Sequence, residues 1–279
     1  MGAPACGACG VSILEFRRPS GHAILQTIFD LENVALSLPV TGGVRAILRD
    51  VSFSLAQREI LTIVGASGTG KTSLLRLLAG LNRQTSGALN FRGTPIDGPQ
   101  AGVAIVFQDY TNALLQWRTV GNNVALGLPK KLDRAARASR ITDTLRLVGL
   151  ERNAGDYPWQ LSGGMQQRVQ IARALVARPS VLLMDEPFAA LDAMTKATLQ
   201  DELLRVRDET NASIVFITHD IEEAVYLGNR VAVLAGSPGA ITRIFAIDIP
   251  FPRHQVTTRE LPAFLRLRHE IHDAIGALA

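Results

Sequence analysis

The stretch Gly65-Ala66-Ser67-Gly68-Thr69-Gly70-Lys71-Thr72 decides how the rest of the 279-residue sequence is interpreted. It fits the pattern G-x-x-x-x-G-K-[ST], follows the β-branched run Glu59 to Val64, and precedes the helical leucine spacing of Lys71 to Ala79. In that context the glycines let backbone N–H groups curl around phosphates, and the helix start adds partial positive charge. Lys71 would reach the β- and γ-phosphates, and the Thr72 hydroxyl would bind Mg²⁺. We therefore predict a nucleoside triphosphate site from Gly65 to Ser73. A flexible glycine-rich turn, the alternative, leaves Lys71 and Thr72 unexplained.

Short apolar segments elsewhere predict the fold. Some are continuously apolar, as is typical of strands covered on both faces in a parallel sheet, namely Val103 to Phe107, Val181 to Met184, Ser213 to Ile217 and Arg230 to Leu234. Leu31 to Leu38 and Val51 to Leu55 instead alternate apolar with polar or small residues and predict an antiparallel β region. Only helical periodicity is found between residues 120 and 177. The predicted fold class is α/β, with a parallel core sheet, an antiparallel β subdomain and a helical subdomain that interrupts the sheet.

Two acidic residues end one of these apolar runs. In Val181-Leu182-Leu183-Met184-Asp185-Glu186-Pro187 the carboxylates stand where a buried strand reaches the edge of the sheet. Asp185 can hold Mg²⁺ there, and Glu186 can polarise a water that attacks a phosphate. Such acids can be mere surface caps. Beside a phosphate-binding stretch, however, they predict metal-assisted hydrolysis.

A second glycine turn, Leu161-Ser162-Gly163-Gly164-Met165-Gln166, immediately precedes a helical segment. Small residues expose backbone N–H groups at a helix N-terminus, and such groups can bind an anion. The turn would thus be a second anion site, in addition to the one formed by the chain's own phosphate-binding stretch. Read alone, the turn is common and weakly informative. Its place after a helical insertion and ahead of Asp185 makes it resemble the signature motif of ABC-type ATPases.

The resemblance to ABC-type ATPases covers the chain from about Leu31 onward and implies a P-loop NTPase core. Further motifs follow in the family's order: Gln108 in Val-Phe-Gln-Asp resembles the Q-loop, Asp192 in Ala-Leu-Asp the D-loop, and His219 in Ile-Thr-His-Asp the switch histidine. The resemblance implies that Gln108 contacts Mg²⁺ and the attacking water, that His219 contacts the γ-phosphate, and that Asp192 acts across a dimer.

The resemblance also implies an assembly. Two subunits of a homodimer would enclose two ATP molecules, each held by one phosphate-binding stretch and by Ser162, Gly163, Gly164 and Gln166 of the other subunit. The stretches Leu115 to Val120, Gln160 to Arg168 and Pro250 to Arg253 are similar to ATPases of sulfonate, taurine and nitrate importers, and aliphatic sulfonates are the expected solute. Such a subunit works with two transmembrane permease subunits and, indirectly, a periplasmic solute-binding protein, as a peripheral protein on the cytoplasmic face of the inner membrane.

Two positions depart from the family's pattern. The aromatic residue that stacks on adenine would fall near Leu38, and no Tyr, Phe or Trp lies between Leu31 and Val51. Phe29 or Tyr110 could fill that place instead. Gln116 stands where this subfamily commonly has proline, in the segment that should face the permease. Neither departure touches the residues expected to bind phosphate.

Composition sets the outer limits. The chain is 47% hydrophobic and 19% charged, which is close to a globular average and argues against disorder. No apolar run approaches the roughly 18 residues that span a bilayer. The net charge of +4 is small and scattered, so we expect no nucleic-acid partner. Cys6 and Cys9 fit a reducing compartment, and we expect them to be inert.

We divide the chain into an extension that we expect to be mobile (1–30), an ATPase domain (31–249) whose helical subdomain covers about 109–178, and a linker with an amphipathic helix (250–279). A non-transport ABC clamp is the main alternative, and it predicts a long coiled coil, a second cassette or a basic groove, none of which the sequence contains. A GTPase or kinase is a third reading. The sequence lacks the guanine-specificity motif of a GTPase, and neither class of enzyme would explain the stretch from Leu161 to Gln166.

Overall fold

The computed structural model describes residues 26–108, 113–129 and 131–276. Cys6, Cys9 and Tyr110 lie outside these ranges, so the expectations placed on them concern residues that are not described.

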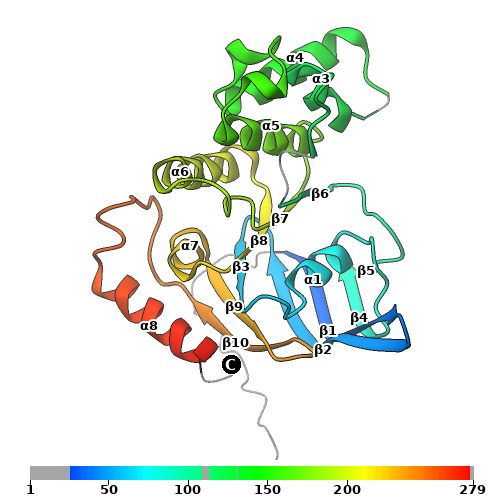
Figure 1. Cartoon of the computed structure of the whole chain (residues 1–279), viewed down its shortest axis with the longest axis vertical. Coiled ribbons are helices and arrows are strands. Elements are labelled where there is room, and N and C mark those ends of the chain that lie inside the picture. The colour runs from blue at the N-terminus through cyan, green and yellow to red at the C-terminus, as the bar shows by residue number, and fades with distance from the viewer. Residues whose placement is uncertain (1–25, 109–112, 130, 277–279) are drawn as a thin grey trace, which may run out of the picture.

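The centre of the molecule is a six-stranded sheet in the order β10-β9-β3-β8-β7-β6 (Figure 1). Its strands are β3 (Ile60–Val64), β6 (Val103–Val106), β7 (Val181–Asp185), β8 (Ser213–Thr218), β9 (Arg230–Ala235) and β10 (Ala240–Ala246). All neighbours pair in parallel except β9 and β10, which form an antiparallel hairpin. The predicted parallel core sheet is confirmed.

A second, antiparallel sheet has the order β2-β1-β4-β5. It consists of β1 (Thr27–Val40), β2 (Gly43–Ala56), β4 (Ser86–Phe91) and β5 (Thr94–Pro95). β1 and β2 form a hairpin whose register brings Val40 opposite Gly43, so its turn is formed by Thr41 and Gly42. The antiparallel subdomain is therefore confirmed as well.

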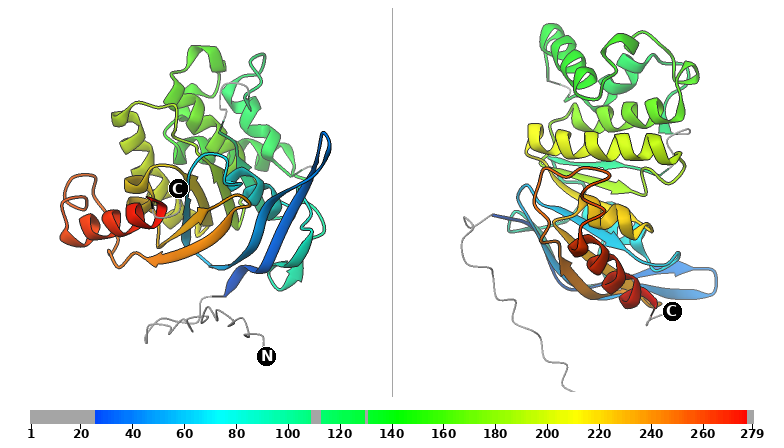
Figure 2. Two further views of the ribbon diagram at one scale, coloured as in Figure 1. Left: turned by 60° about the horizontal axis from the view of Figure 1, so that its bottom comes forward. Right: turned by 90° about the vertical axis from the view of Figure 1, so that its left-hand side faces the viewer.

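The chain between β6 and β7 is helical, as expected. Its elements are α3 (Val120–Val124), η1 (Ala125–Gly127), α4 (Arg134–Leu147), η2 (Glu151–Asn153), η3 (Pro158–Gln160) and α5 (Gly163–Leu175). The side chains of Thr119, Asp133 and Ser162 cap the three α-helices, because each accepts a hydrogen bond from a first-turn N–H group. In the right-hand view of Figure 2, α3, α4 and α5 lie above α6, and the strands β1 and β2 lie at the opposite end of the molecule.

The alternation of side chains along the parallel strands builds two cores, one on each face of the sheet. Leu182, Met184 and Phe216 belong to the core that also contains the helical subdomain and α8 (Pro262–Gly276). Leu183 and Ile217 belong to the core beneath α1 (Lys71–Leu78) and the antiparallel sheet. Because both faces are covered, these strands are apolar on both faces along most of their length.

Two further helices flank the core sheet, α6 (Ala193–Thr210) and α7 (Ile221–Leu227). The last described helix, α8, buries Phe264, Leu267 and Ile271 on one side, as expected of an amphipathic helix, and packs against α7. Among the described residues, no helix combines the length and the apolar character needed to cross a bilayer.

Candidate functional site

The stretch from Gly65 to Thr72 forms the loop between β3 and α1, and its glycines meet specific backbone demands. Gly68 and Gly70 have φ values of 82° and 96°, in the left-handed region that glycine adopts without strain. The Thr69 hydroxyl donates to the Ala66 carbonyl at 3.0 Å and closes the loop. Helix α1 starts directly afterwards at Lys71, so the loop leads into a helix N-terminus, a place where phosphate binds favourably.

The backbone of the β9–β10 hairpin lies in close contact with one side of this loop. A Cβ atom on Gly65 would lie 2.1 Å from the Leu234 carbonyl oxygen. A Cβ atom on Gly239 would lie 2.0 Å from the Thr69 carbonyl oxygen. Both contacts are backbone to backbone, so neither position has room for a side chain.

Lys71 turns back over the loop that precedes it. Its Nζ donates to the carbonyl oxygens of Gly65 (2.9 Å) and Ala66 (3.0 Å), and it lies 3.7 Å from Oε1 of Glu186. The lysine side chain is only 7% exposed. A buried ammonium held at the mouth of a loop of N–H groups is suited to bind an anion.

Asp185 and Thr72 supply the oxygen atoms that Mg²⁺ prefers. The Thr72 hydroxyl donates a hydrogen bond to the buried Asp185 carboxylate. Burial raises the pKa of Asp185, and the hydrogen bond from Thr72 opposes that shift. The described residues contain no group of three or more His, Cys, Asp or Glu side chains that could hold a metal by themselves. This donor set fits Mg²⁺ held by one or two protein oxygens together with substrate phosphates.

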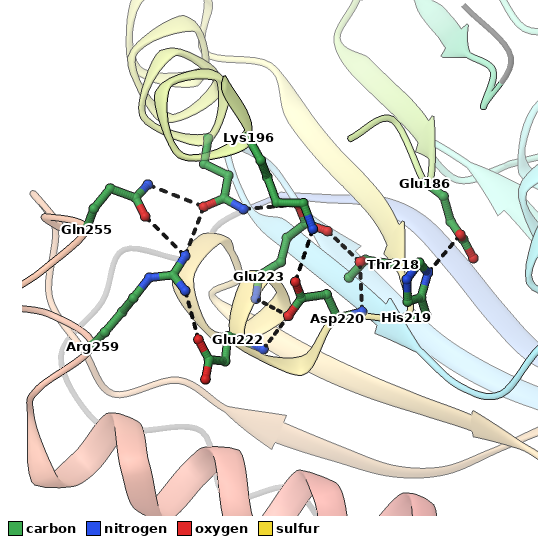
Figure 3. A network of polar contacts seen from close by, with 10 residues as sticks. Glu186, Lys196, Thr218, His219, Asp220, Glu222, Glu223, Gln255 and Arg259 are labelled. Atoms are coloured by element: carbon green, nitrogen blue, oxygen red, sulfur yellow. Dashed lines mark hydrogen bonds and ion pairs between the residues drawn. The ribbon is translucent and has the colours of Figure 1, made fainter. Parts of the chain in front are cut away.

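Glu186 and His219 meet at the same edge of the sheet. Glu186 has a φ of 43°, a left-handed conformation that is uncommon for a residue with a side chain, and its N–H donates to the Ile217 carbonyl at 3.0 Å. Its Oε2 lies 2.9 Å from Nδ1 of His219, whose side chain is 60% exposed (Figure 3). The structure thus brings together five predicted residues: Lys71, Thr72, Asp185, Glu186 and His219.

Sequence reasoning missed the polar residues behind His219. The Thr218 hydroxyl accepts from the N–H of Asp220 at 3.0 Å and donates to the buried Glu223 carboxylate. Asp220 also forms an ion pair with Lys196 of α6 at 3.1 Å. The sequence Thr218-His219-Asp220-Ile221-Glu222-Glu223 contains the signal, because Asp220 is an N-cap residue type followed by acids in a first turn.

The second glycine turn forms a separate group in the helical subdomain. Ser162 caps α5, and its Oγ accepts from the Met165 N–H at 3.4 Å. A Cβ on Gly164 would lie 2.5 Å from Cγ2 of Thr195, so the turn abuts the first turn of α6. Gln166 points back into its own subdomain, since its Nε2 donates to the carbonyls of Pro158 (3.0 Å) and Leu161 (3.2 Å).

Asp192 lies next to this group. Its carboxylate caps α6 by accepting from the N–H groups of Met194 (3.1 Å) and Thr195 (3.0 Å). Hydrogen bonds from the side chain and the backbone of Thr195 lower the pKa of Asp192. Within one chain, no hydrogen bond or ion pair among the described residues links Ser162, Gly164 or Asp192 to Lys71 or Glu186.

Gln108 follows β6, whose register places Val106 opposite Met184 of β7. Gln108 is therefore at the same sheet edge as Glu186, and it is exposed. It has no hydrogen bond to Thr72, Asp185 or Glu186 in the part of the chain that the structure describes.

The position expected to face the base is not aromatic. Leu38 is half-buried on β1 opposite Arg45, and it packs at the border of the core beneath α1. Phe29 is completely buried, with its ring 5.1 Å from that of Phe91. The suggestion that Phe29 stacks on the base is therefore wrong, because its ring already packs inside the protein.

Comparison with known proteins agrees with this geometry. The sequence model of the family described as ABC transporter matches residues 48–189. The chain is 42% identical over 234 residues to the nitrate import ATP-binding protein NrtC of Synechococcus elongatus, covering 82% of this chain and 35% of that protein. It therefore spans about a third of the length of that relative.

Two other proteins match over nearly their full length. The aliphatic sulfonates import ATP-binding protein SsuB 1 of Xanthomonas axonopodis pv. citri is 41% identical over 252 residues, which is 87% of this chain and 99% of that protein. A dimeric ATP-binding cassette solved in a post-hydrolysis state with ADP and Pi has a TM-score of 0.69 and 28% identity, covering 80% of this chain and 100% of that one. The chain belongs to the ABC transporter family.

Proposed function

We propose that this chain hydrolyses MgATP as a homodimer and couples hydrolysis to the import of a small anionic solute. The observation that carries the proposal is the convergence of Lys71, Glu186 and His219. The Glu186 carboxylate lies 3.7 Å from the lysine ammonium and 2.9 Å from the imidazole. A base placed between a phosphate-binding cation and a hydrogen-bonding histidine is the arrangement that hydrolysis of a γ-phosphate needs.

In this proposal each residue has one task. The loop N–H groups and Lys71 bind the β- and γ-phosphates, and Thr72 and Asp185 hold Mg²⁺, which when bound neutralises phosphate charge. Glu186 orients the attacking water and accepts its proton as the bond between the γ-phosphorus and the ADP oxygen breaks. His219 fixes the Glu186 carboxylate and contacts the γ-phosphate. Gln108 is proposed to contact Mg²⁺ and the water from the neighbouring strand.

The site is proposed to be completed by a second copy of the chain. Ser162, Gly163 and Gly164 offer N–H groups at the start of α5, yet in the described part of the chain no hydrogen bond or ion pair joins them to the phosphate loop of their own chain. In a dimer they would meet the γ-phosphate held by the partner, and Asp192 would lie beside them. Gln166 would support this turn from behind rather than contact nucleotide, because its amide bonds to the preceding loop.

The transported solute is proposed from the names of the relatives. Relatives are named for nitrate, bicarbonate and aliphatic sulfonates, which are all small anions. We propose aliphatic sulfonates first, followed by taurine and nitrate, with two permease subunits and a periplasmic binding protein as partners. The chain would then act at the cytoplasmic face of the inner membrane. A non-transport clamp is the alternative.

Reconstitution in liposomes tests both the proposed ATP hydrolysis and the proposed solute. The chain is purified with a sulfonate-importer permease, placed in liposomes with the matching periplasmic binding protein, and supplied with MgATP. We expect hydrolysis that stops with EDTA and rises with the loaded binding protein, together with uptake of a sulfonate in preference to nitrate and bicarbonate. Uptake of another anion would change the solute alone. Absence of MgATP hydrolysis in every arrangement would remove the enzymatic proposal.

A further inference from the structure

The backbone on both sides of His219 is fixed by side chains rather than by the sheet alone. The Thr218 hydroxyl donates to Glu223 and accepts from the Asp220 N–H at 3.0 Å. The Asp220 carboxylate in turn caps α7, accepting from the N–H groups of Glu222 (3.0 Å) and Glu223 (3.2 Å). The position of the His219 ring beside Glu186 therefore depends on where the Glu223 carboxylate is held.

Glu223 is held by a buried amide on the neighbouring helix. Its Oε1 accepts from Nε2 of Gln200 at 3.0 Å, and both side chains are almost inaccessible to solvent. Gln200 comes from α6 and Glu223 from α7, so this bond helps to join the two helices behind the histidine. The bond forms only if the amide presents its NH₂ group, and not its oxygen, to the carboxylate.

Residues from the C-terminal segment determine which way that amide points. Arg259 Nη2 donates to Gln200 Oε1 at 3.1 Å, and Gln255 Nε2 donates to the same oxygen at 3.3 Å (Figure 3). A reversed amide would set its NH₂ against the guanidinium and its oxygen against the Glu223 carboxylate. Because Gln200 is fully buried, those groups would be left without hydrogen-bond partners, which disfavours the reversed amide.

Arg259 is itself anchored on α7. Its Nη1 donates to Glu222 Oε2 at 2.9 Å, and its guanidinium lies 5.2 Å from the centre of the Tyr226 ring. Arg253 holds the far end of the same helix, donating from Nη1 to the carbonyls of Val225 (2.9 Å) and Tyr226 (2.7 Å). The C-terminal segment, residues 250–276, therefore contacts α7 at both ends, although none of its residues was expected to contact nucleotide.

We propose that Arg259 is a positioning residue for His219, acting through Gln200, Glu223 and Thr218. The guanidinium fixes the Gln200 amide, the amide fixes the Glu223 carboxylate, and the carboxylate fixes the turn that carries the histidine. The inference rests on the proposed function, because it concerns the histidine of the hydrolytic site. It makes the C-terminal segment a determinant of the hydrolysis rate.

Steady-state hydrolysis by the full chain tests the proposal. Arg259→Ala should lower kcat about threefold or more, with KM for ATP nearly unchanged, since neighbouring residues in one network couple by amounts of this order. Arg259→Lys, which keeps the charge but loses the planar fork, should recover part of the rate. Introduced into a His219→Ala chain, Arg259→Ala should change the residual rate little, because the residue through which it acts is gone.

Arg268→Ala is the matched control. Arg268 donates to Glu222 Oε1 at 2.8 Å, so the variant removes an ion pair between α8 and α7 and leaves Gln200 untouched. It should keep the wild-type kcat. If Arg259→Ala lowers the rate equally with and without His219, or if Arg268→Ala lowers it as much as Arg259→Ala, the positioning role is wrong and the network only stabilises the fold.

A spectroscopic arm separates this inference from the proposed function. In ¹⁵N-histidine-labelled chain without nucleotide, the ring signals of His219 are assigned from their loss in His219→Ala. We expect Arg259→Ala and Gln255→Ala to move these signals toward their positions in Glu186→Gln, and Arg268→Ala to leave them in place. Unmoved signals in both variants would overturn the inference even in a chain that hydrolyses ATP. Moved signals in a chain that hydrolyses none would leave the positional link standing and remove only the enzymatic role.

Discussion

Oε2 of Glu186 lies 2.9 Å from Nδ1 of His219, and this contact joins the ends of β7 and β8 across the edge of the parallel sheet. The two side chains differ in solvent exposure, because the Glu186 side chain is 17% exposed and the His219 side chain is 60% exposed. The carboxylate is thus the more buried partner and the imidazole the more accessible one. A histidine in that position can reach a phosphate while it keeps the carboxylate oriented.

Glu186→Gln should separate nucleotide binding from hydrolysis. The amide keeps the shape of the side chain but cannot accept the proton of the attacking water, so hydrolysis should fall by roughly 10²- to 10⁴-fold. The variant should bind MgATP and remain a closed dimer, which size-exclusion chromatography with ATP will show. A variant that stays monomeric with ATP, or hydrolyses it at the wild-type rate, would remove Glu186 from the catalytic role.

Lys71→Ala should fail at an earlier step. A charge-assisted contact to the phosphates contributes roughly 1.5 to 3 kcal/mol, so ATP affinity should weaken about tenfold or more. Titration of ATP by calorimetry measures the change. Arg83→Ala, which removes an exposed cation paired with Asp97 on the surface, is a control that should bind nearly as the wild type does. Undiminished affinity in Lys71→Ala would contradict the phosphate-loop assignment.

How much of this site could be read from the sequence depends on how local each interaction is. Lys71 bonds to carbonyls five and six positions away, and a local pattern is enough to place it. The Arg259–Gln200 contact spans 59 positions and the Gln200–Glu223 contact 23, and both exist only because α6, α7 and the C-terminal segment pack together. No periodicity or spacing encodes that packing.

The strand order illustrates the same limit. Apolar runs revealed the strands one by one, but the order β3-β8-β7 was not evident from them. That order places β8 between the phosphate loop and Asp185, and so brings His219 beside Glu186. His219 itself was expected only through the family resemblance, since its local surroundings carry no motif of their own chemistry.

Mixing two inactive variants tests whether each site is shared between chains. Lys71→Ala and Ser162→Arg homodimers should both be inactive. In a mixed dimer one site carries both lesions and the other carries neither, so part of the hydrolysis should return. If each site were built within one chain, every site would contain a lesion and mixing would restore nothing.

Asp185→Asn should stabilise the nucleotide-free chain. Burial raises the pKa of Asp185, so the folded chain binds this proton more tightly than the unfolded chain does, and stability is lost as the pH rises through the interval between the two pKa values. At pH 7 the ionised carboxylate therefore destabilises the fold. We expect a higher Tm in Asp185→Asn, each kcal/mol corresponding to roughly 2 to 4 °C in a domain of this size.

The same variant should lose the additional rise in Tm that MgATP gives to the wild type, because a Mg²⁺ ligand is missing. Asp97→Asn is the control, since Asp97 is an exposed carboxylate paired with Arg83 on the surface. A lower Tm in Asp185→Asn without nucleotide would show that burial does not dominate the energetics of this carboxylate.

Leu38→Tyr tests the place of the base. A stacked aromatic contributes roughly 1 to 3 kcal/mol against a nucleobase, whereas leucine offers only apolar contact. With Phe29 buried, we expect the tyrosine to tighten ATP binding several-fold and to sharpen the preference for ATP over GTP. Unchanged or weaker binding would mean that Leu38 does not face the adenine.

The two crowded glycines, Gly65 and Gly239, fix one boundary of the nucleotide site. Since backbone atoms of the β9–β10 hairpin leave no space behind the phosphate loop, the loop cannot recede when a nucleotide enters or leaves. Access to the phosphates must therefore be controlled from the opposite side, where the glycine turn of a second copy would arrive. In the proposed cycle the β9–β10 hairpin and the phosphate loop therefore stay in place, and the groups that move are those that approach the loop from the opposite side.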